Sequence, residues 1–159
     1  MTSFYRYMIL VGLLALGTAR AAEPFPQPPE LQPDVDFWVA VFTEYSTDEG
    51  VLHDNRNLAV VYERLEMPAT LSRRERNRRV DKRRKALQAT LRALAAGKRD
   101  NLSTEETRVL ALWPENVSNS ELAAAVKRIR YQQGLRERFR SGLERSGRWR
   151  DYINSEFTA

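Results

Sequence analysis

The stretch IRYQQGLRERFRSGLERSGRWRDYINSEF, residues 129–157, decides how the chain is expected to fold. Its apolar residues recur at helical spacing, and no strand-like alternation interrupts them. The apolar stripe at the start of the stretch moves to the opposite side of the helix at Tyr131, because each residue turns a helix by about 100°. The spacing therefore predicts one long helix from Ser118 to Gly147, which either bends near Gly134 or meets two different partners.

A last short helix is predicted after Gly147. Its apolar side consists of Trp149, Tyr152, Ile153 and Phe157. These side chains form a large apolar surface for so short a helix, and exposed surfaces of this kind mark sites of association. We expect another domain to cover them, or weak self-association where nothing does.

The chain before residue 118 also has a helical pattern. Three Ser-x-x-Glu sequences predict capping boxes at helix starts, namely Ser72-Glu75, Ser103-Glu106 and Ser118-Glu121. The helices predicted before residue 118 cover residues 34–45, 58–65, 72–96 and 103–113, with an extended or turning segment at 51–54. The predicted fold class is all-α, an irregular bundle of about five to six helices.

The N-terminus has the features of a secretory signal peptide. Arg6 precedes the apolar run Met8–Leu16, and Ala19-Arg20-Ala21 suits signal peptidase. The run has about half of the ~20 residues that span a bilayer, so we expect no stable membrane insertion after cleavage; a retained anchor is the alternative. The sequence has no cysteine, which excludes a lipid-modified cysteine in it. We expect a periplasmic protein with a signal peptide (1–21), a proline-rich tether (22–33) and a helical domain (34–159).

No catalytic, cofactor-binding or metal-binding residue is assigned from the sequence. His53 is the only histidine and lacks metal-ligand spacing or a paired serine, so a role in a turn or in the core is expected. Adjacent carboxylates such as Glu105 and Glu106 diverge on a helix, so they do not form a glycosidase pair. We therefore expect no cofactor and no metal.

Three segments carry a resemblance to a known family: VLHD (51–54), KRRKALQATLRAL (82–94) and the run 129–149. Together they resemble the N-terminal helical region of periplasmic lytic transglycosylases, near the membrane-bound lytic murein transglycosylase D group, over about residues 37–157. In that family a segment like RERFRSGLERSGRWRDYI (136–153) is followed by a glutamate-serine pair and a glycine-rich motif. Nothing like either follows Phe157 in this sequence.

The resemblance implies a place in peptidoglycan remodelling. The whole enzyme would cleave the MurNAc-GlcNAc bond and form a 1,6-anhydro product, with a glutamate as general acid. No glutamate of this sequence matches that residue. We therefore expect the non-catalytic N-terminal part of a lytic transglycosylase, truncated before the catalytic domain, with peptidoglycan and that domain as partners. The alternative is a self-contained periplasmic helical protein that binds peptidoglycan or a cell-wall enzyme.

Charge is unevenly distributed along the chain, whose formal net charge is +5. Residues 22–71 hold ten acidic and two basic residues, whereas residues 72–99 hold twelve basic and two acidic ones. The basic block RRERNRRVDKRRK (73–85) invites a nucleic-acid partner, but export and the absence of interleaved aromatic residues argue against one. Three hypotheses remain for this block: a solvated helical face, contact with peptidoglycan carboxylates or anionic lipid headgroups, or docking against residues 22–71.

Overall fold

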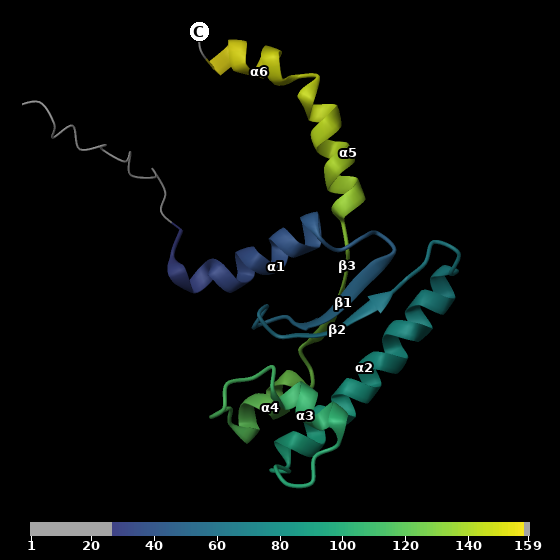
Figure 1. The fold of residues 1–159 in the computed structure, drawn as a ribbon, viewed down its shortest axis with the longest axis vertical. Coiled ribbons are helices and arrows are strands. Elements are labelled where there is room, and N and C mark those ends of the chain that lie inside the picture. Colours follow the sequence, from purple (N-terminus) through teal and green to yellow (C-terminus); the bar gives the residue numbers. More distant parts are fainter. Residues whose placement is uncertain (1–26, 158–159) are drawn as a thin grey trace, which may run out of the picture.

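The computed structural model describes residues 27–157 (Figure 1). The predicted signal peptide and residues 22–26 of the predicted tether lie outside the described residues. The described chain begins with a 3-10 helix, η1. Its elements are η1 Pro29–Leu31, α1 Gln32–Thr43, β1 Glu49–Asp54, β2 Val61–Glu66, α2 Arg73–Ala95, α3 Thr104–Leu110, α4 Asn119–Ala125, β3 Ile129–Gln133, α5 Arg136–Gly147 and α6 Arg150–Phe157.

The fold contains both helices and a sheet, so the predicted all-α class is wrong. Three antiparallel strands lie in the order β2-β1-β3, with β1 in the centre. The predicted helix over residues 58–65 is in fact the turn into β2 and most of that strand. Leu58, Val61 and Leu65 have helical spacing, but Val60 and Tyr62 between them are fully buried. Tyr62 and Leu65 of β2 are buried whereas Arg64 and Glu66 are exposed, so the buried positions 60, 62 and 65 follow neither a helical spacing nor a strict alternation.

The predicted long helix from Ser118 is also wrong, because the chain leaves the helix after Ala125. Residues 129–133 pair with β1, which places Tyr131 opposite Leu52. The Tyr131 ring lies directly against Gly50, where a Cβ atom would overlap the phenol. Pairing with a strand about 80 residues earlier in the chain therefore overrides the local helical pattern.

The helices predicted over residues 34–45, 72–96 and 103–113 are confirmed, with ends that differ by a few residues. Full capping boxes form at Ser72 and at Ser103. Ser118 accepts the backbone N–H of Glu121, but the Glu121 carboxylate binds Arg128 at 2.6 Å instead of closing the box.

Helices cover both faces of the sheet (Figure 1). On one face, Leu52 and Tyr62 join a core with Leu87, Leu91 and other residues of α2, α3 and α4. On the other face, Val51 packs with Phe37 and Val41 of α1. The sheet thus separates a large core from a small one, and α1 alone supplies the helical layer over the small core.

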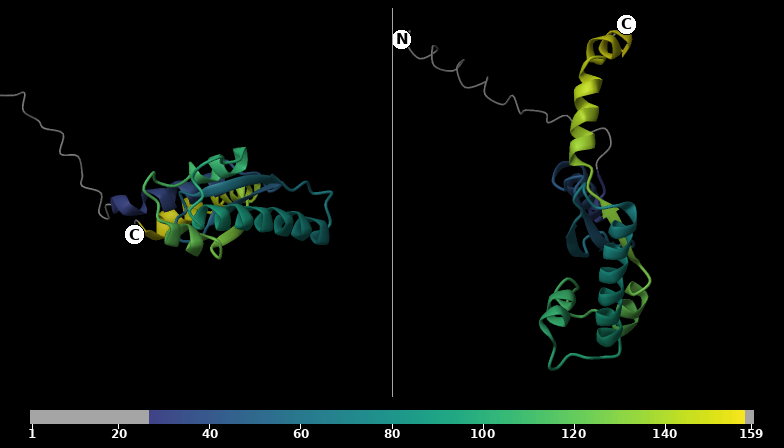
Figure 2. Two further views of the ribbon diagram at one scale, coloured as in Figure 1. Left: turned by 90° about the horizontal axis from the view of Figure 1, so that it is seen from below. Right: turned by 90° about the vertical axis from the view of Figure 1, so that its right-hand side faces the viewer.

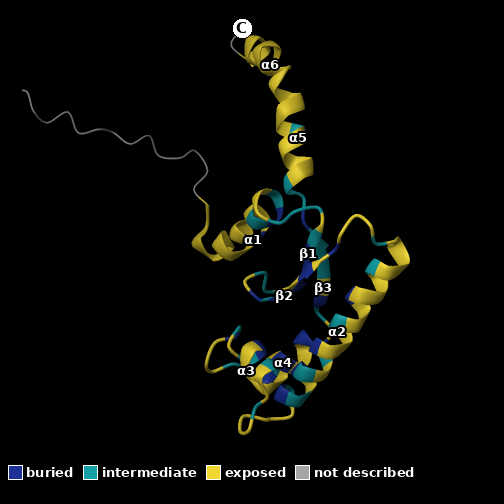
Figure 3. Cartoon of the chain, turned by 45° about the vertical axis from the view of Figure 1, so that its right-hand side comes forward, coloured by how far each residue is buried: buried dark blue, intermediate teal, exposed yellow. Residues whose placement is uncertain are grey.

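Helices α5 and α6 project from the body as an arm (Figure 2). None of their residues is buried, in contrast to α1 through α4 (Figure 3). We call α5 and α6 together the α5–α6 arm.

Candidate functional site

The α5–α6 arm presents large apolar side chains to solvent. Trp149 and Tyr152 expose 63% and 62% of their surface, and Phe157 exposes 87%. Ile153 and Leu143 are also exposed. Monomeric proteins rarely expose contiguous apolar surface of this kind, whose usual role is to bind another surface. The last-helix apolar side predicted from the sequence is therefore present and uncovered.

The base of the arm is fixed to the body by backbone hydrogen bonds. The N–H groups of Gly134 and Leu135 donate to the carbonyls of Glu49 and Val41, at 3.0 and 2.8 Å. Gly134 is required here because a Cβ atom would overlap the carbonyl oxygens of Tyr45 and Ser46. The start of α5 therefore has one defined position against the turn between α1 and β1.

One carboxylate reinforces this connection. Glu137 accepts the backbone N–H of Thr47 at 2.7 Å and pairs with Arg136 at 2.8 Å. The Thr47 hydrogen bond lowers the pKa of Glu137 to about 2. The carboxylate is therefore ionised at neutral pH and joins the first turn of α5 to the α1–β1 turn.

A second apolar surface connects α1 to the arm. Phe42 of α1 contacts two other aromatic rings. Its ring centroid lies 6.0 Å from that of Trp38, also on α1, and 5.3 Å from that of Phe139 on α5. Hollows of about 370 and 540 Å³ lie along these side chains, and the smaller one also exposes Val35 and Val39. Apolar surface thus continues from α1 onto α5.

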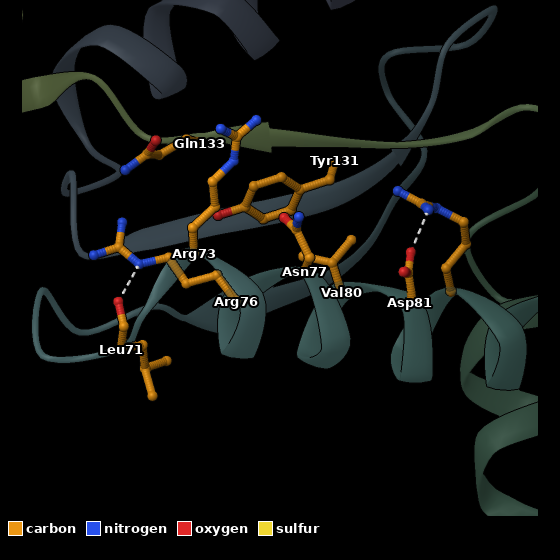
Figure 4. Close-up of a pocket in the computed structure, with 9 residues that line it drawn as sticks. Leu71, Arg73, Arg76, Asn77, Val80, Asp81, Tyr131 and Gln133 are labelled. Carbon is orange, nitrogen blue, oxygen red and sulfur yellow. Dashed lines mark hydrogen bonds and ion pairs between the residues drawn. The ribbon is translucent and has the colours of Figure 1, made fainter.

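A polar cleft of about 790 Å³ lies between Arg73–Arg84 of α2 and Tyr131–Gln133 of β3 (Figure 4). We call it the α2–β3 cleft. In Figure 4 the side chains of Arg73 and Asn77 rise from α2 beside the Tyr131 ring. Residues 73, 76 and 77 are three or four positions apart, or adjacent, along α2. The first two turns of α2 therefore direct these side chains to the face that lines the cleft.

Positive charge exceeds negative charge in the α2–β3 cleft. Arg84 pairs with Asp81 at 2.8 Å, whereas Arg76 donates only to the backbone carbonyls of Leu71 and Ala69. Arg73 has no hydrogen-bond or ion-pair partner among the described residues. Burial raises the pKa of the Tyr131 phenol, against the opposing effect of the Arg76 charge, so the hydroxyl remains a donor at neutral pH.

His53 lies against Phe37 of the small core, and a turn or the core is where the sequence placed it. It is buried beneath Phe37 with ring centroids 4.6 Å apart, and its Nδ1 lies 3.1 Å from the Asp54 carbonyl. Burial lowers the pKa of the imidazole, so the ring is neutral at pH 7. Within residues 27–157 no group of three or more metal-ligating side chains is found.

The basic block has more than one environment. Arg83 pairs with Glu63 of β2 at 2.8 Å, and Arg79 donates to the Glu66 carbonyl at 2.7 Å. These contacts agree with the hypothesis that the block docks against residues 22–71. Arg74, in contrast, is exposed without a partner among the described residues. Sequence reasoning missed Tyr131 and Gln133, because residues 129–133 have the apolar spacing of a helix.

Comparisons of the chain with protein-family models, with curated proteins and with solved structures find no match. None of the described helices is long and apolar enough to cross a membrane.

Proposed function

We propose that this chain is the non-catalytic N-terminal part of a peptidoglycan lytic transglycosylase and that it positions the catalytic domain through the α5–α6 arm. The observation that supports the proposal is the arm itself, which has a fixed base and an uncovered apolar side. The resemblance described above covers the same residues, 129–157. The proposed domain is mixed α/β, in place of the helical bundle expected from the sequence.

The arm has the properties that positioning requires. Its base is held by three backbone N–H donors, those of Gly134, Leu135 and Arg136. Its far end carries Trp149 and Phe157, and burying a large apolar side chain contributes about 1.5–3 kcal/mol. Several such side chains offset part of the entropy cost of fixing one domain against another. A catalytic domain that covers the arm would therefore be held in one orientation.

The α2–β3 cleft favours the alternative, a self-contained periplasmic protein that binds peptidoglycan or a cell-wall enzyme. Peptidoglycan stems carry carboxylates, and the cleft contains two guanidinium groups, those of Arg73 and Arg76, without a carboxylate partner. The first function uses the α5–α6 arm, and the alternative uses the α2–β3 cleft. Experiments on each surface therefore distinguish the two functions.

The test is to mix the purified chain with a separately produced lytic transglycosylase catalytic domain encoded in the same genome. We expect a complex on size-exclusion chromatography that the double variant Trp149→Ser/Phe157→Ser weakens. Leu31→Ser is the matched control, because Leu31 is also exposed but lies outside the arm. Absence of a complex would overturn the proposal.

A second assay separates the two candidate functions. The chain is incubated with peptidoglycan sacculi, which are then pelleted and analysed for 1,6-anhydro muropeptides. Pelleting without any complex with the catalytic domain favours the self-contained binding protein. Release of anhydro products by this chain alone would contradict a non-catalytic role.

A further inference from the structure

The α2–β3 cleft has the size of a small-molecule site. Its volume of about 790 Å³ lies within the usual range for ligand pockets. A single phosphate ion would fill little of it. The lining combines apolar atoms of Leu71 and Val80 with polar groups of Asn77, Tyr131 and Gln133. Such a lining suits an organic ligand with one charged group better than a bare ion.

The charge of the lining selects an anion. The lining contains three arginines, Arg73, Arg76 and Arg84, but only one carboxylate. That carboxylate, Asp81, is paired with Arg84. The Nε–H of Arg84 is buried and donates to no acceptor within the described chain. A neighbouring basic hollow on α2 is lined by five basic residues, of which Arg64 and Arg83 are paired with Glu49 and Glu63. The α2–β3 cleft differs from it in the buried, unpaired Nε–H of Arg84 and in the polar groups that β3 contributes.

The positions of the polar groups are set by the fold. Tyr131 is held by strand pairing with Leu52 and by its contact with Gly50. The Gln133 amide nitrogen donates to the Thr47 carbonyl at 2.7 Å, which leaves its oxygen available as an acceptor. Arg76 is held by its two carbonyl bonds. Polar groups that the fold holds in place bind a ligand with little ordering cost.

From these features we infer that the α2–β3 cleft binds a small organic ligand through its carboxylate, with Arg73 as the principal charged contact. A planar guanidinium matches a carboxylate through two parallel hydrogen bonds. The Tyr131 hydroxyl and the Asn77 amide supply neutral hydrogen bonds to the rest of the ligand. This inference does not depend on the proposed role of the arm, because the cleft shares no lining residue with the hollows along α1 and α5. It deepens the alternative function, in which the same cleft binds peptidoglycan carboxylates.

The probe for the test is N-acetylmuramoyl-L-alanyl-D-isoglutamine, which carries a single carboxylate. Its methyl ester is the neutral counterpart, and inorganic phosphate is the third probe. Each is titrated to about 10 mM against isotope-labelled protein, so that a site with a Kd of about 1 mM approaches saturation. We expect the acid to shift the arginine Nε–Hε signal of Arg73 and the backbone amides around Tyr131, and the ester to bind at least about tenfold more weakly.

Two matched variants decide whether the acid binds in the α2–β3 cleft. Arg73→Gln should weaken binding of the acid about tenfold, because a charge-assisted contact is lost. Arg74→Gln removes the same charge from the next residue, which does not line the cleft, and should leave binding unchanged. Equal losses in both variants would mean that the general charge of α2 is responsible and would overturn the inference.

Two further outcomes of the titrations would overturn parts of the inference. Binding of phosphate without binding of the acid would overturn the choice of a carboxylate. Absence of shifts with all three probes would overturn the site. Neither result affects complex formation by the arm, so failure here is distinguishable from failure of the proposed function.

Discussion

Asp54 is fully buried, and its two carboxylate oxygens have different roles. One oxygen accepts the backbone N–H groups of Arg56 and Asn57, at 2.8 and 3.0 Å, and shapes the turn between β1 and β2. The other accepts Nε of Arg128 at 2.8 Å, which joins that turn to the start of β3. A single side chain thus connects parts of the chain that are 74 residues apart.

Replacement of Asp54 should therefore be costly. In Asp54→Ala the two turn N–H groups lose their acceptor and the mostly buried Arg128 loses its buried carboxylate partner, keeping only Glu121, so we expect a loss of roughly 3 kcal/mol in the free energy of unfolding. Urea denaturation, monitored by circular dichroism, measures this loss in the free energy of unfolding. Asp48→Asn, at an exposed carboxylate, is the control and should change stability by less than about 0.5 kcal/mol. A loss below about 1 kcal/mol in Asp54→Ala would contradict the assigned role.

The double variant Asp54→Ala/Arg128→Met distinguishes the two contributions. If the loss of the buried carboxylate beside Arg128, which then keeps only the exposed Glu121 as a partner, causes much of the destabilisation, the double variant should be more stable than Asp54→Ala alone. If the turn hydrogen bonds cause all of it, the second substitution should recover nothing.

At the scale of whole elements, the sequence predicts the helices with local start signals and an extended or turning segment at 51–54, where β1 lies, but misses β2 and β3. Helix α2 was predicted because Ser72 and Glu75 form their capping box within four residues. Strand β2 was missed because a register shift between Leu52 and His53 interrupts the alternation, so that Tyr62 and Leu65 are its buried residues. Strand β3 exists through pairing with β1, and no local residue type signals that pairing.

The same limit applies to the candidate sites. The apolar side of the last helix was predicted because the apolar spacing of α6 is local and survives in the structure. Of the α2–β3 cleft, only the arginines of the basic block could be named from the sequence. Tyr131 and Gln133 reach the cleft because residues 129–133 form a strand, so their location depends on the missed pairing.

The connection between the α5–α6 arm and the body should depend on pH. The ordinary pKa of Glu137 is 4.5, and the Thr47 N–H lowers it to about 2 in the folded protein. A lowered pKa stabilises the fold fully above pH 4.5, and this contribution is lost as the pH falls from 4.5 towards 2. The stability difference between wild type and Glu137→Gln should therefore be present at pH 6 and disappear near pH 2.

The Thr47 amide reports this contact directly. Its NMR chemical shift should titrate with a midpoint near 2 in the wild type and should lose that transition in Glu137→Gln. Glu144→Gln serves as the control, since Glu144 lies on the same helix with an exposed side chain, and it should leave the Thr47 titration unchanged. A wild-type midpoint near 4.5 would show that the hydrogen bond does not persist in solution.

At the scale of the whole molecule, the body and the α5–α6 arm differ in how much of their apolar surface is covered. Leu87, Leu91 and Leu94 of α2 are fully buried, whereas every residue of α6 is exposed (Figure 3). The body therefore has its own core, to which the α5–α6 arm contributes no buried residue. The arm is the part of the described chain that gains most from contact with another surface.

The isolated chain should consequently self-associate weakly through the arm. Burial of a few large apolar side chains contributes about 1.5–3 kcal/mol each, and association costs at least about 4 kcal/mol, so a Kd on the order of 0.1–1 mM is expected. Sedimentation velocity over a range of concentrations should show a rising sedimentation coefficient. Trp149→Ser/Phe157→Ser should abolish the rise, and Leu31→Ser should not, because Leu31 lies outside the arm although it is also exposed. A monomer at every concentration would mean that the exposed side chains of α6 do not bind a second copy, and the catalytic domain of the proposed function would then be the surface to test.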